Sequence, residues 1–485
     1  MPQPRRIDYL WSVLCAVTAA LSNAQVAAQA PATPDKPWPI PQNAAREAQQ
    51  HFDVRGLEPR KRYGLVELID LAQRNNPQTR GAWEAAREAA AAVGLVESSY
   101  LPQISLEALG GLEHTPLPAP KNLVPEGFFV SNAREIIPSV AVKWLLFDFG
   151  QRKAKLEAAR ADSFVANVSF TGAHQTLIFQ VSQAYFDLGA ARGRLRAAQS
   201  ALKTALTTQD ATTAKRNNGL ATIVSVAQAE RQTAQARYGL TAAEGTERNA
   251  YANLIASLGI PADSALEVVD TDELPLPAQP IQNVSAAIRD ALAHRPDVIA
   301  AIGQVDAARA SLDAEQRSRY PVISVSATGF QNLGWLSSDG KPYSRVDKPG
   351  GNLLLSFSVP LFDGGLRSSR ISVARSKVGE AEKKLDEARD TAAQQVVKAY
   401  NGLVTSLSEY EASTELSRAA HTAYDAALRS YRQGVGTYTD VSTEENAVVQ
   451  ADTEVEDARA SAHTAAAALV FAMGTPAGPD ESRTP

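Results

Sequence analysis

The chain has 485 residues with 48 Lys or Arg and 53 Asp or Glu, so its formal net charge is −5. The basic residues are scattered rather than clustered, which argues against a nucleic-acid partner. The only cysteine, Cys15, lies in a segment that we predict to be removed. Disulfides, thiolate metal sites and cysteine nucleophiles are therefore excluded from the mature chain.

The first 30 residues have the pattern of a secretory signal. Two arginines precede a short apolar stretch over 10–21, and the small-residue sequence Ala-Gln-Ala at 28–30 ends the segment. The stretch is shorter than the roughly 20 residues of a membrane span. A membrane anchor, an apolar helix and lipidation of Cys15 are less favoured alternatives; Leu14 stands where lipidation prefers a small residue.

Residues 31–63 are polar and contain several prolines, which predicts an extended segment. The next stretch, 65–100, is predicted to be helical with a stop or kink where Asn76 precedes Pro77. The residue before a proline disfavours the helical region, so Pro102 is expected to end this stretch.

After Pro102 the apolar residues alternate with others, which indicates strands with one apolar face, including Ile104, Leu106 and Ala108 and later Val140, Val142 and Trp144. The two runs flank a polar segment, 113–135, that we expect to be an exposed loop. Each run is near the 9–11 residues with which a tilted strand crosses a bilayer. An ordinary hairpin in a soluble sheet would show the same alternation, so both possibilities remain open.

A very long helix is expected over 151–217. Its apolar residues recur at alternating steps of four and three, the spacing of helices packed in a coiled coil: Leu177, Val181, Ala184, Leu188, Ala191, Leu195, Ala198, Leu202 and Ala205. A helix of this length would extend roughly 100 Å. Gly219 then breaks the helix, and a second helix returns over 223–258.

The second half of the chain repeats the first at a constant offset of 215 residues. The offset relates Phe147 to Phe362, Tyr185 to Tyr400, Gly219 to Gly434 and Gly259 to Gly474. A constant offset over so long a stretch indicates a duplicated structural unit. We expect the repeated tyrosines to serve packing rather than function.

The duplication divides the chain into two similar domains. We assign a signal peptide to 1–30, an extended segment to 31–63, the first repeat to 64–260, a linker to 261–283, the second repeat to 284–474 and a disordered tail to 475–485. The second repeat is expected to contain a helical stretch over 284–320 broken at Arg295-Pro296, two strands around an exposed loop at 331–350, a long helix over 366–432 and a returning helix over 438–473.

Two strand pairs give four strands per chain, and four strands cannot close a barrel. Open sheet edges are not tolerated in lipid, and bacterial membrane barrels have at least eight strands. If these strands lie in a membrane, the chain must therefore oligomerise.

The duplicated unit, the Phe-Asp-x-Gly junctions at Phe147 and Phe362, the Asn-Pro start and the Tyr-x-x-Gly turn at Tyr431 together resemble TolC-type outer-membrane efflux proteins over about 65–474. The resemblance implies a mixed α and β membrane protein in which three chains share a twelve-stranded outer-membrane barrel. Their helices would continue as a long α-helical barrel across the periplasm. The implied partners are two further copies of the chain, a periplasmic adaptor, an inner-membrane pump or ATP-binding transporter, and outer-membrane lipid.

Two helix turns at the periplasmic tip carry the adaptor-docking sites that the resemblance implies. Their residues are Arg216, Gly219, Leu220 and Thr222 in the first turn and Arg432, Gly434, Gly436 and Thr437 in the second. Glycine allows the backbone to turn sharply, and the arginines can bond to carbonyls or carboxylates of a partner. Turns that merely close a hairpin are the alternative.

The resemblance also implies a channel gate. The first of the family's gate aspartates falls on Asp440, and three such carboxylates around one opening would attract cations and repel anions. The second falls on Thr443, a first-half aspartate of the closed state falls on Ser225, and Gly436 replaces an arginine of the same latch. We therefore expect one aspartate ring and weaker or different closing contacts. A solvated carboxylate at a helix start is the alternative for Asp440.

The sequence contains no phosphate-binding loop, and its six histidines lack metal-ligand spacing. We expect no catalytic residue, no metal and no cofactor, so energy for transport must come from a partner. The resemblance implies a passive conduit for small toxic compounds, or for an unfolded protein in type I secretion. A soluble periplasmic coiled-coil adaptor or scaffold is the alternative.

Overall fold

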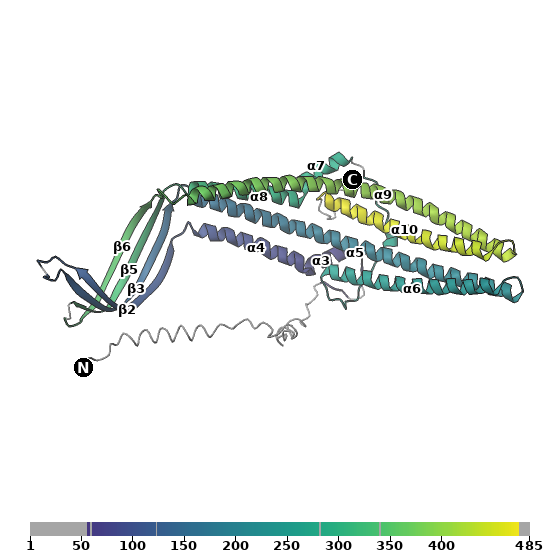
Figure 1. Ribbon diagram of the computed structural model, residues 1–485, viewed down its shortest axis with the longest axis horizontal. Coiled ribbons are helices and arrows are strands. Elements are labelled where there is room, and N and C mark those ends of the chain that lie inside the picture. Colours follow the sequence, from purple (N-terminus) through teal and green to yellow (C-terminus); the bar gives the residue numbers. More distant parts are fainter. Residues whose placement is uncertain (1–55, 59–60, 123, 281–282, 339–340, 475–485) are drawn as a thin grey trace, which may run out of the picture. The chain divides into compact units, whose positions relative to one another are not determined.

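The computed structural model of the protein describes residues 56–58, 61–122, 124–280, 283–338 and 341–474 (Figure 1). The predicted signal peptide with Cys15, most of the extended segment and the predicted tail lie outside the described residues. Among the helices that are described, none is long and apolar enough to cross a membrane.

Each repeat begins with two helices that meet at a proline: α3 (Leu65–Asn75) and α4 (Pro77–Ser98) in the first, α7 (Val284–His294) and α8 (Pro296–Arg317) in the second. Proline occupies the first helical position of α4 and α8, where its missing N–H costs nothing. The Asn76 side chain caps α4 by accepting a hydrogen bond from the Gln78 N–H at 2.8 Å. Both predicted breaks are therefore confirmed as helix ends.

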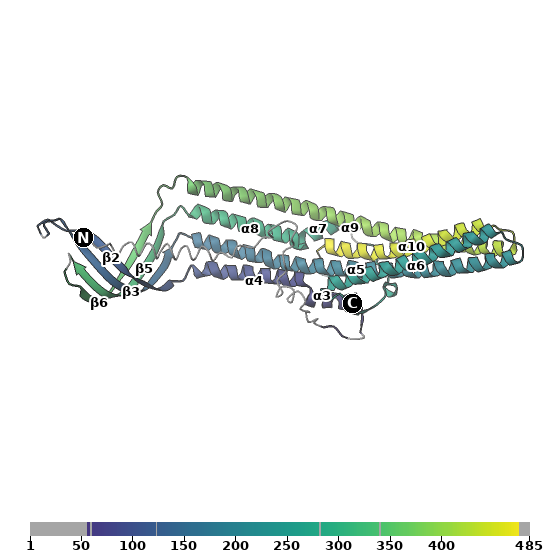
Figure 2. The same cartoon turned by 60° about the horizontal axis from the view of Figure 1, so that its bottom comes forward.

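Four long strands form one antiparallel sheet in the order β2–β3–β5–β6, seen together in Figures 1 and 2. They are β2 (Gln103–Pro118), β3 (Phe128–Phe147), β5 (Val322–Ser338) and β6 (Ser344–Ser358). The hairpins of the two repeats join through β3 and β5, and β2 and β6 are the edge strands. Separately, the short β1 (Arg62–Tyr63) pairs in parallel with β4 (Glu267–Val268).

The prediction of long exposed loops at 113–135 and 331–350 was wrong, because β2 and β3, and β5 and β6, continue through most of both segments. Ladder hydrogen bonds join backbone groups, so polar side chains do not end a strand. Proline interrupts the ladder only locally: the β3–β5 register skips Ile137 and Pro138 and then resumes. The connections that remain are 119–127 and 339–343.

The register places apolar residues on one face of the sheet, as the alternation predicts. Directly paired residues lie on the same side of a ladder, and one such row across the four strands is Ile104, Val142, Ala327 and Leu353. The neighbouring row on the other face is Ser105, Ala141, Thr328 and Asn352. Leu353 is 74% exposed, so the apolar face is uncovered within the chain.

The repeated Phe-Asp motif fastens each strand pair to the long helix that follows. Asp148 accepts hydrogen bonds from the Arg152 N–H (2.8 Å) and Nε (3.1 Å), and Arg152 reaches back to the Leu145 carbonyl (2.8 Å). In the second repeat Asp363 accepts from the Arg367 N–H (3.1 Å) and Nε (2.6 Å). The first pair is buried, and a buried ion pair with these additional bonds holds one geometry.

The predicted long and returning helices are confirmed as α5 (Gln151–Asn217), α6 (Ile223–Leu258), α9 (Leu366–Gln433) and α10 (Tyr438–Ala472). α5 packs against α6 and α10, and α9 packs against α10 (Figure 2). All the predicted seam residues of α5 are buried or half-buried. Tyr185 is 1% exposed and donates a hydrogen bond to the Val269 carbonyl at 3.1 Å, as expected of a packing residue.

Candidate functional site

The first predicted docking turn joins α5 to α6 at the end of the helical region farthest from the sheet (Figure 1). Gly219 has φ +73°, and the following Leu220 N–H donates to the Lys215 carbonyl at 2.8 Å. Thr222 starts α6 by accepting a hydrogen bond from the Ser225 N–H at 3.1 Å. The turn therefore depends on glycine, because other residues rarely adopt this φ.

The second predicted docking turn joins α9 to α10 at the same end (Figures 1 and 2). Gly434 ends α9 with φ +87°. The N–H groups of Val435 and Gly436 both donate to the Ser430 carbonyl at 3.1 Å, and Thr437 starts α10. Both turns therefore place a left-handed glycine after the long helix and a threonine before the returning one.

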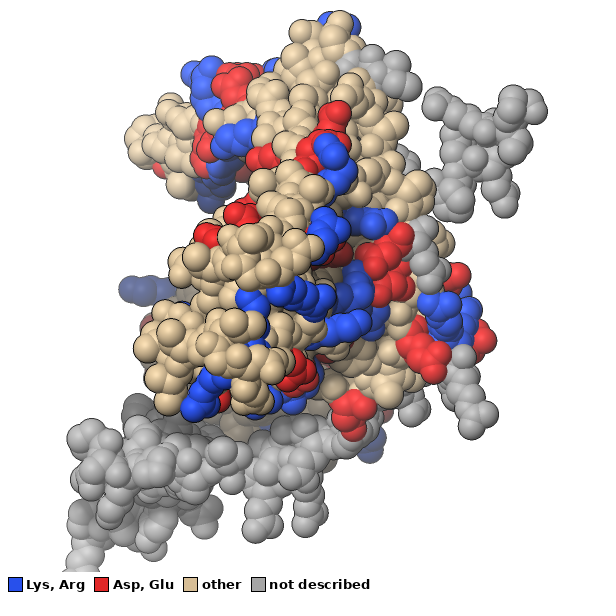
Figure 3. Space-filling view, turned by 90° about the vertical axis from the view of Figure 1, so that its right-hand side faces the viewer, with Lys and Arg blue, Asp and Glu red and all other residues tan. Residues whose placement is uncertain are grey.

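Of the eight predicted docking residues, all are exposed except Gly436, which is half-buried. The guanidinium groups of Arg216 and Arg432 form no hydrogen bond or ion pair with any other described residue. Figure 3 looks onto this end and shows uncharged side chains over the protruding hairpin ends, with basic side chains close by. The tip thus offers free donors to a partner.

Two further apolar residues at the start of α6 were missed by the sequence analysis, and Val435 lies within the second predicted turn. Ile223, Val224 and Val435 are 66%, 60% and 81% exposed, and the predicted Leu220 is 73% exposed. Large apolar side chains that gather at one exposed end indicate a protein contact surface. Ile223 and Val224 directly follow the helix-capping Thr222, and this position was the signal that could have identified them.

Asp440 lies in the first turn of α10 and is exposed. Its carboxylate accepts a hydrogen bond from the Thr437 N–H at 2.9 Å, and its own N–H donates to Thr437 Oγ1 at 3.2 Å, which forms a capping box. The backbone bond from Thr437 lowers the pKa of Asp440 below its usual value. The carboxylate is therefore charged at neutral pH and also caps the helix.

The other positions matched to the gate hold no charge. Thr443 is exposed on α10, and the Ser225 hydroxyl lies 3.0 Å from the Thr222 hydroxyl. Gly436 contributes only its backbone N–H to the turn. Of the four positions matched to the family's gate, only Asp440 therefore carries a charged side chain.

Side-chain contacts link α5 to α9 next to the turns, and the sequence analysis missed them. The Lys215 ammonium donates to the Tyr431 carbonyl and lies 4.1 Å from the centre of the Tyr431 ring. The Tyr431 hydroxyl in turn donates to Thr212 Oγ1 at 3.3 Å. A cation over an aromatic face and two hydrogen bonds thus join the first helix hairpin to the second.

Glu445 is a buried acid on α10, about one and a half turns after Asp440. It is 1% exposed, and its Oε2 has no hydrogen-bond partner among the described residues. Burial raises the pKa of Glu445 to about 7, although a hydrogen bond with Thr208 of α5 opposes the shift. Burial raises the pKa values of Tyr424 of α9 and Tyr438 of α10, and the charge of Glu445 adds to both shifts. The carboxyl group therefore changes charge near neutral pH.

Within the described part of the chain, no group of three or more His, Cys, Asp or Glu side chains could hold a metal ion. The features at the tip are instead a charged carboxylate, free guanidinium groups, exposed apolar side chains and contacts between two hairpins. This arrangement suits binding and gating.

Comparison with known proteins agrees with this geometry. The family model described as outer membrane efflux protein matches residues 68–260 and 287–475. The chain belongs to this family. It is an outer-membrane channel protein with a periplasmic helical tunnel, and it is a conduit rather than an enzyme.

Among curated relatives, this efflux protein is 28% identical over 374 residues to protein CyaE of Bordetella pertussis, covering 77% of this chain and 76% of that protein. It is 25% identical over 414 residues to outer membrane protein TolC of Escherichia coli, covering 81% and 79%. The solved open state of the Neisseria gonorrhoeae MtrE outer membrane channel matches with a TM-score of 0.68 at 22% identity, covering 84% of this chain and 88% of that one. The structural match confirms the fold inferred from the repeats.

Proposed function

We propose that three copies of this chain form one channel that conducts cargo passively from the periplasm to the outside. The observation that carries the proposal is the four-stranded sheet, in which the edge strands β2 and β6 each pair on one side only within the described chain. Lipid does not tolerate open edges. Three copies would supply twelve strands, enough to exceed the eight of the smallest bacterial barrels.

The two repeats, 64–260 and 284–474, would act as equivalent building units on either side of the linker 261–283. Each contributes one strand pair and one helix hairpin, so three chains supply six quasi-equivalent units around the channel axis. The uncovered apolar face of the sheet favours the channel over a soluble periplasmic adaptor or scaffold, in which that face would have no purpose.

The two helix turns are proposed to dock a periplasmic adaptor, which would couple the channel to an inner-membrane pump or ATP-binding transporter. The support is the exposure of Leu220 and Val435 together with the unpaired guanidinium groups of Arg216 and Arg432. Apolar anchors next to arginines are common in protein interfaces.

Asp440 is proposed to line the gate as a ring of three carboxylates. Its lowered pKa keeps it charged, and the contacts of Lys215 and Tyr431 would hold neighbouring hairpins in the closed state. Opening would then require these contacts to separate when the adaptor and pump engage the tip.

The cargo is proposed to be either small toxic compounds or an unfolded protein. Energy would come from the inner-membrane partner, because the sequence has no phosphate-binding loop. A deletion strain complemented with this gene separates the classes: restored resistance to toxic compounds identifies efflux, and restored release of a protein into the medium identifies secretion.

The channel proposal is tested by purifying the protein from membranes in detergent. We expect an unheated sample to migrate at about three times the mass of one mature chain and to form pores in planar bilayers. A water-soluble monomer without pore activity would contradict the proposal.

A further inference from the structure

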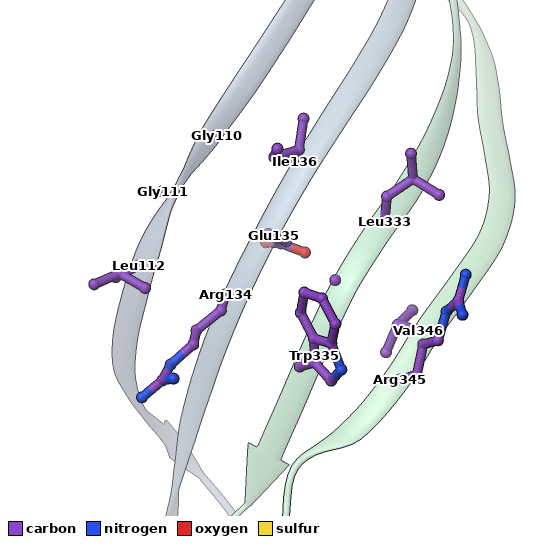
Figure 4. A pocket seen from close by; sticks show the side chains of 11 residues that line it. Gly110, Gly111, Leu112, Arg134, Glu135, Ile136, Leu333, Trp335, Arg345 and Val346 are labelled. Carbon is purple, nitrogen blue, oxygen red and sulfur yellow. The ribbon is translucent and has the colours of Figure 1, made fainter.

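A row of four directly paired residues crosses the sheet near its outer end. Leu112 of β2 pairs with Arg134 of β3, Arg134 with Trp335 of β5, and Trp335 with Arg345 of β6. Directly paired residues point to the same side of the sheet, and Figure 4 shows these side chains from adjacent strands. The two arginines therefore flank one tryptophan on three adjacent strands of a single chain.

This Arg–Trp–Arg row (Arg134, Trp335 and Arg345) lies on the apolar face. Towards the helices, the next row on that face contains Ile136, Leu333 and Asp347. Away from the helices, the next row contains Asn132 and Ser337. On β3 and β5 the row therefore separates apolar neighbours from polar ones.

Near the helical end of the sheet, the same face carries Trp144, whose indole N–H donates to the Tyr100 carbonyl at 2.8 Å. Trp144 lies ten residues from Arg134 along β3. At about 3.4 Å per residue and a tilt of about 40°, this separation corresponds to about 25 Å of membrane depth. That depth matches the lipid-facing band of an outer-membrane barrel, which is bounded by aromatic residues at both interfaces.

The two levels, at Trp144 and at the Arg–Trp–Arg row, can be assigned to the two leaflets. The strand ends near Trp144 lead into α4, α5, α8 and α9, and those helices belong to the periplasmic tunnel. The Arg–Trp–Arg row therefore lies at the outer leaflet, at the level of the lipid headgroups.

The chemistry of the row fits phosphate. Trp335 is 54% exposed and the Arg345 side chain is 75% exposed. The Arg134 guanidinium lies 4.6 Å from the centre of the Tyr343 ring, which orients it without neutralising it. Asp347, one row inward, lies 3.6 Å from Arg345 but also accepts a hydrogen bond from Gln331 at 2.6 Å.

We propose that Arg134 and Arg345 bind the phosphate groups of an anionic lipid in the outer leaflet, with Trp335 packed between them at the interface. Arginine forms bidentate, charge-assisted hydrogen bonds with phosphate. Adjacent strands lie about 4.8 Å apart, so the two arginines stand about 10 Å apart across β5, a spacing that one phosphorylated headgroup or two adjacent ones can bridge. The proposal rests on the outer-membrane location and does not depend on cargo, adaptor or gate.

The test uses quenching of Trp335 fluorescence by brominated lipids, in a variant whose other mature-chain tryptophans are replaced by phenylalanine. The trimer is reconstituted with brominated phosphatidylglycerol or brominated phosphatidylcholine in a background of unlabelled phosphatidylcholine. We expect preferential quenching by phosphatidylglycerol and a roughly fivefold loss of that preference for each arginine changed to glutamine, R134Q and R345Q.

The matched control is Lys348→Gln, which removes the same charge from β6 on the opposite face, where Lys348 pairs with Asn332. Arg134→Lys with Arg345→Lys keeps the charge and should retain part of the preference. Heat-dependent migration of the trimer checks that every variant is folded.

Two outcomes would overturn the proposal. One is an unchanged lipid preference in the double glutamine variant, or an equal loss in Lys348→Gln. The other is abolition of the preference by millimolar inorganic phosphate at constant ionic strength, which would indicate a site for free phosphate instead of a lipid headgroup.

Discussion

The two helix hairpins share one backbone plan but differ in the side chains that would act at the tip. At the offset of 215 residues, Thr222 corresponds to Thr437, and both start a returning helix. Ser225 corresponds to Asp440, so only the second hairpin has a carboxylate in its cap. Duplication therefore preserved the residues that shape the backbone and left the charges at the opening free to diverge.

The same comparison shows that equivalent residues can have different environments. Glu230 is exposed on α6, whereas the corresponding Glu445 on α10 is 1% exposed. Within the chain α6 packs on α5 and α3, while α10 packs on both α9 and α5. The position of a helix in the bundle, and not its repeat register, determines whether this carboxyl group is buried.

The largest expected effect comes from bulk at the second turn. Gly434→Trp should abolish export while the trimer still assembles, because the indole would occupy the proposed docking surface and a side chain is strained at φ +87°. Export assays in a complemented deletion strain measure this effect.

Gly434→Asn is the control, since asparagine tolerates the left-handed conformation and is small; it should retain most export. Full export by Gly434→Trp would remove the second turn from the docking surface. The corresponding Gly219→Trp variant then shows whether the two turns contribute equally.

The next expected effect is a pH dependence of the second hairpin. The folded pKa of Glu445, about 7, exceeds its ordinary value of 4.5, so the folded protein keeps a proton that the unfolded chain has lost. The contribution of Glu445 to the free energy of unfolding is fully present below pH 4.5. It decreases by an amount on the order of 3 kcal/mol as the pH rises through about 7.

Hydrogen exchange of the first turns of α10, corrected for intrinsic rates, measures this loss between pH 5 and pH 8. Glu445→Gln should make the exchange rate less dependent on pH and slow the exchange of the tip at pH 8. Glu230→Gln should behave like the wild type. Identical profiles for Glu445→Gln and the wild type would show that Glu445 does not titrate in this range.

A smaller effect is expected from the contacts between hairpins. Lys215→Ala removes the ammonium from the Tyr431 carbonyl and ring. A lost charge-assisted hydrogen bond costs about 1.5–3 kcal/mol, so the closed state should be destabilised by roughly tenfold or more relative to the open state.

Single-channel recording measures this change as more frequent openings or higher conductance. Ser430→Ala at the corresponding position of the second repeat is the control, because the Ser430 contacts in the turn use its backbone carbonyl. If Lys215→Ala leaves the conductance of the closed channel unchanged, contacts other than that of Lys215 hold the gate closed.

The smallest expected effect separates the two roles of Asp440. Asp440→Asn removes the charge but can still accept the bond from the Thr437 N–H, so cation preference should weaken with little loss of stability. Asp440→Ala removes both the charge and the acceptor, and should lower the unfolding temperature through the lost capping box.

Reversal potentials in a salt gradient measure the preference, and thermal unfolding measures the cap. If Asp440→Asn keeps the wild-type cation preference, Asp440 is a helix cap and not a gate residue.

Much of the fold could be predicted because its signals are local. The prolines at Pro77 and Pro296 end helices, the glycines at Gly219 and Gly434 permit turns, and the three–four spacing of α5 predicts its seam. Strand length could not be predicted in this way, because pairing outside the apolar band depends on the partner strand and not on side-chain polarity.

At the tip, sequence reasoning selected Asp440 and the turn residues but missed Lys215, Tyr431 as a contact residue, and Glu445. Lys215 lies 216 residues from Tyr431, and no local pattern connects them. Glu445 looked like one more carboxylate on a helix face, since its burial depends on α5 and α9.

By itself the sequence determined the duplication, the helix and strand types and the places where the backbone turns, because periodicity, proline and glycine act over a few residues. Only the tertiary structure decided which side chains meet: the Arg–Trp–Arg row through strand register, the Lys215–Tyr431 contact through hairpin packing and the raised pKa of Glu445 through burial. These features join segments distant in sequence, and their energies arise from proximity that only the folded bundle creates.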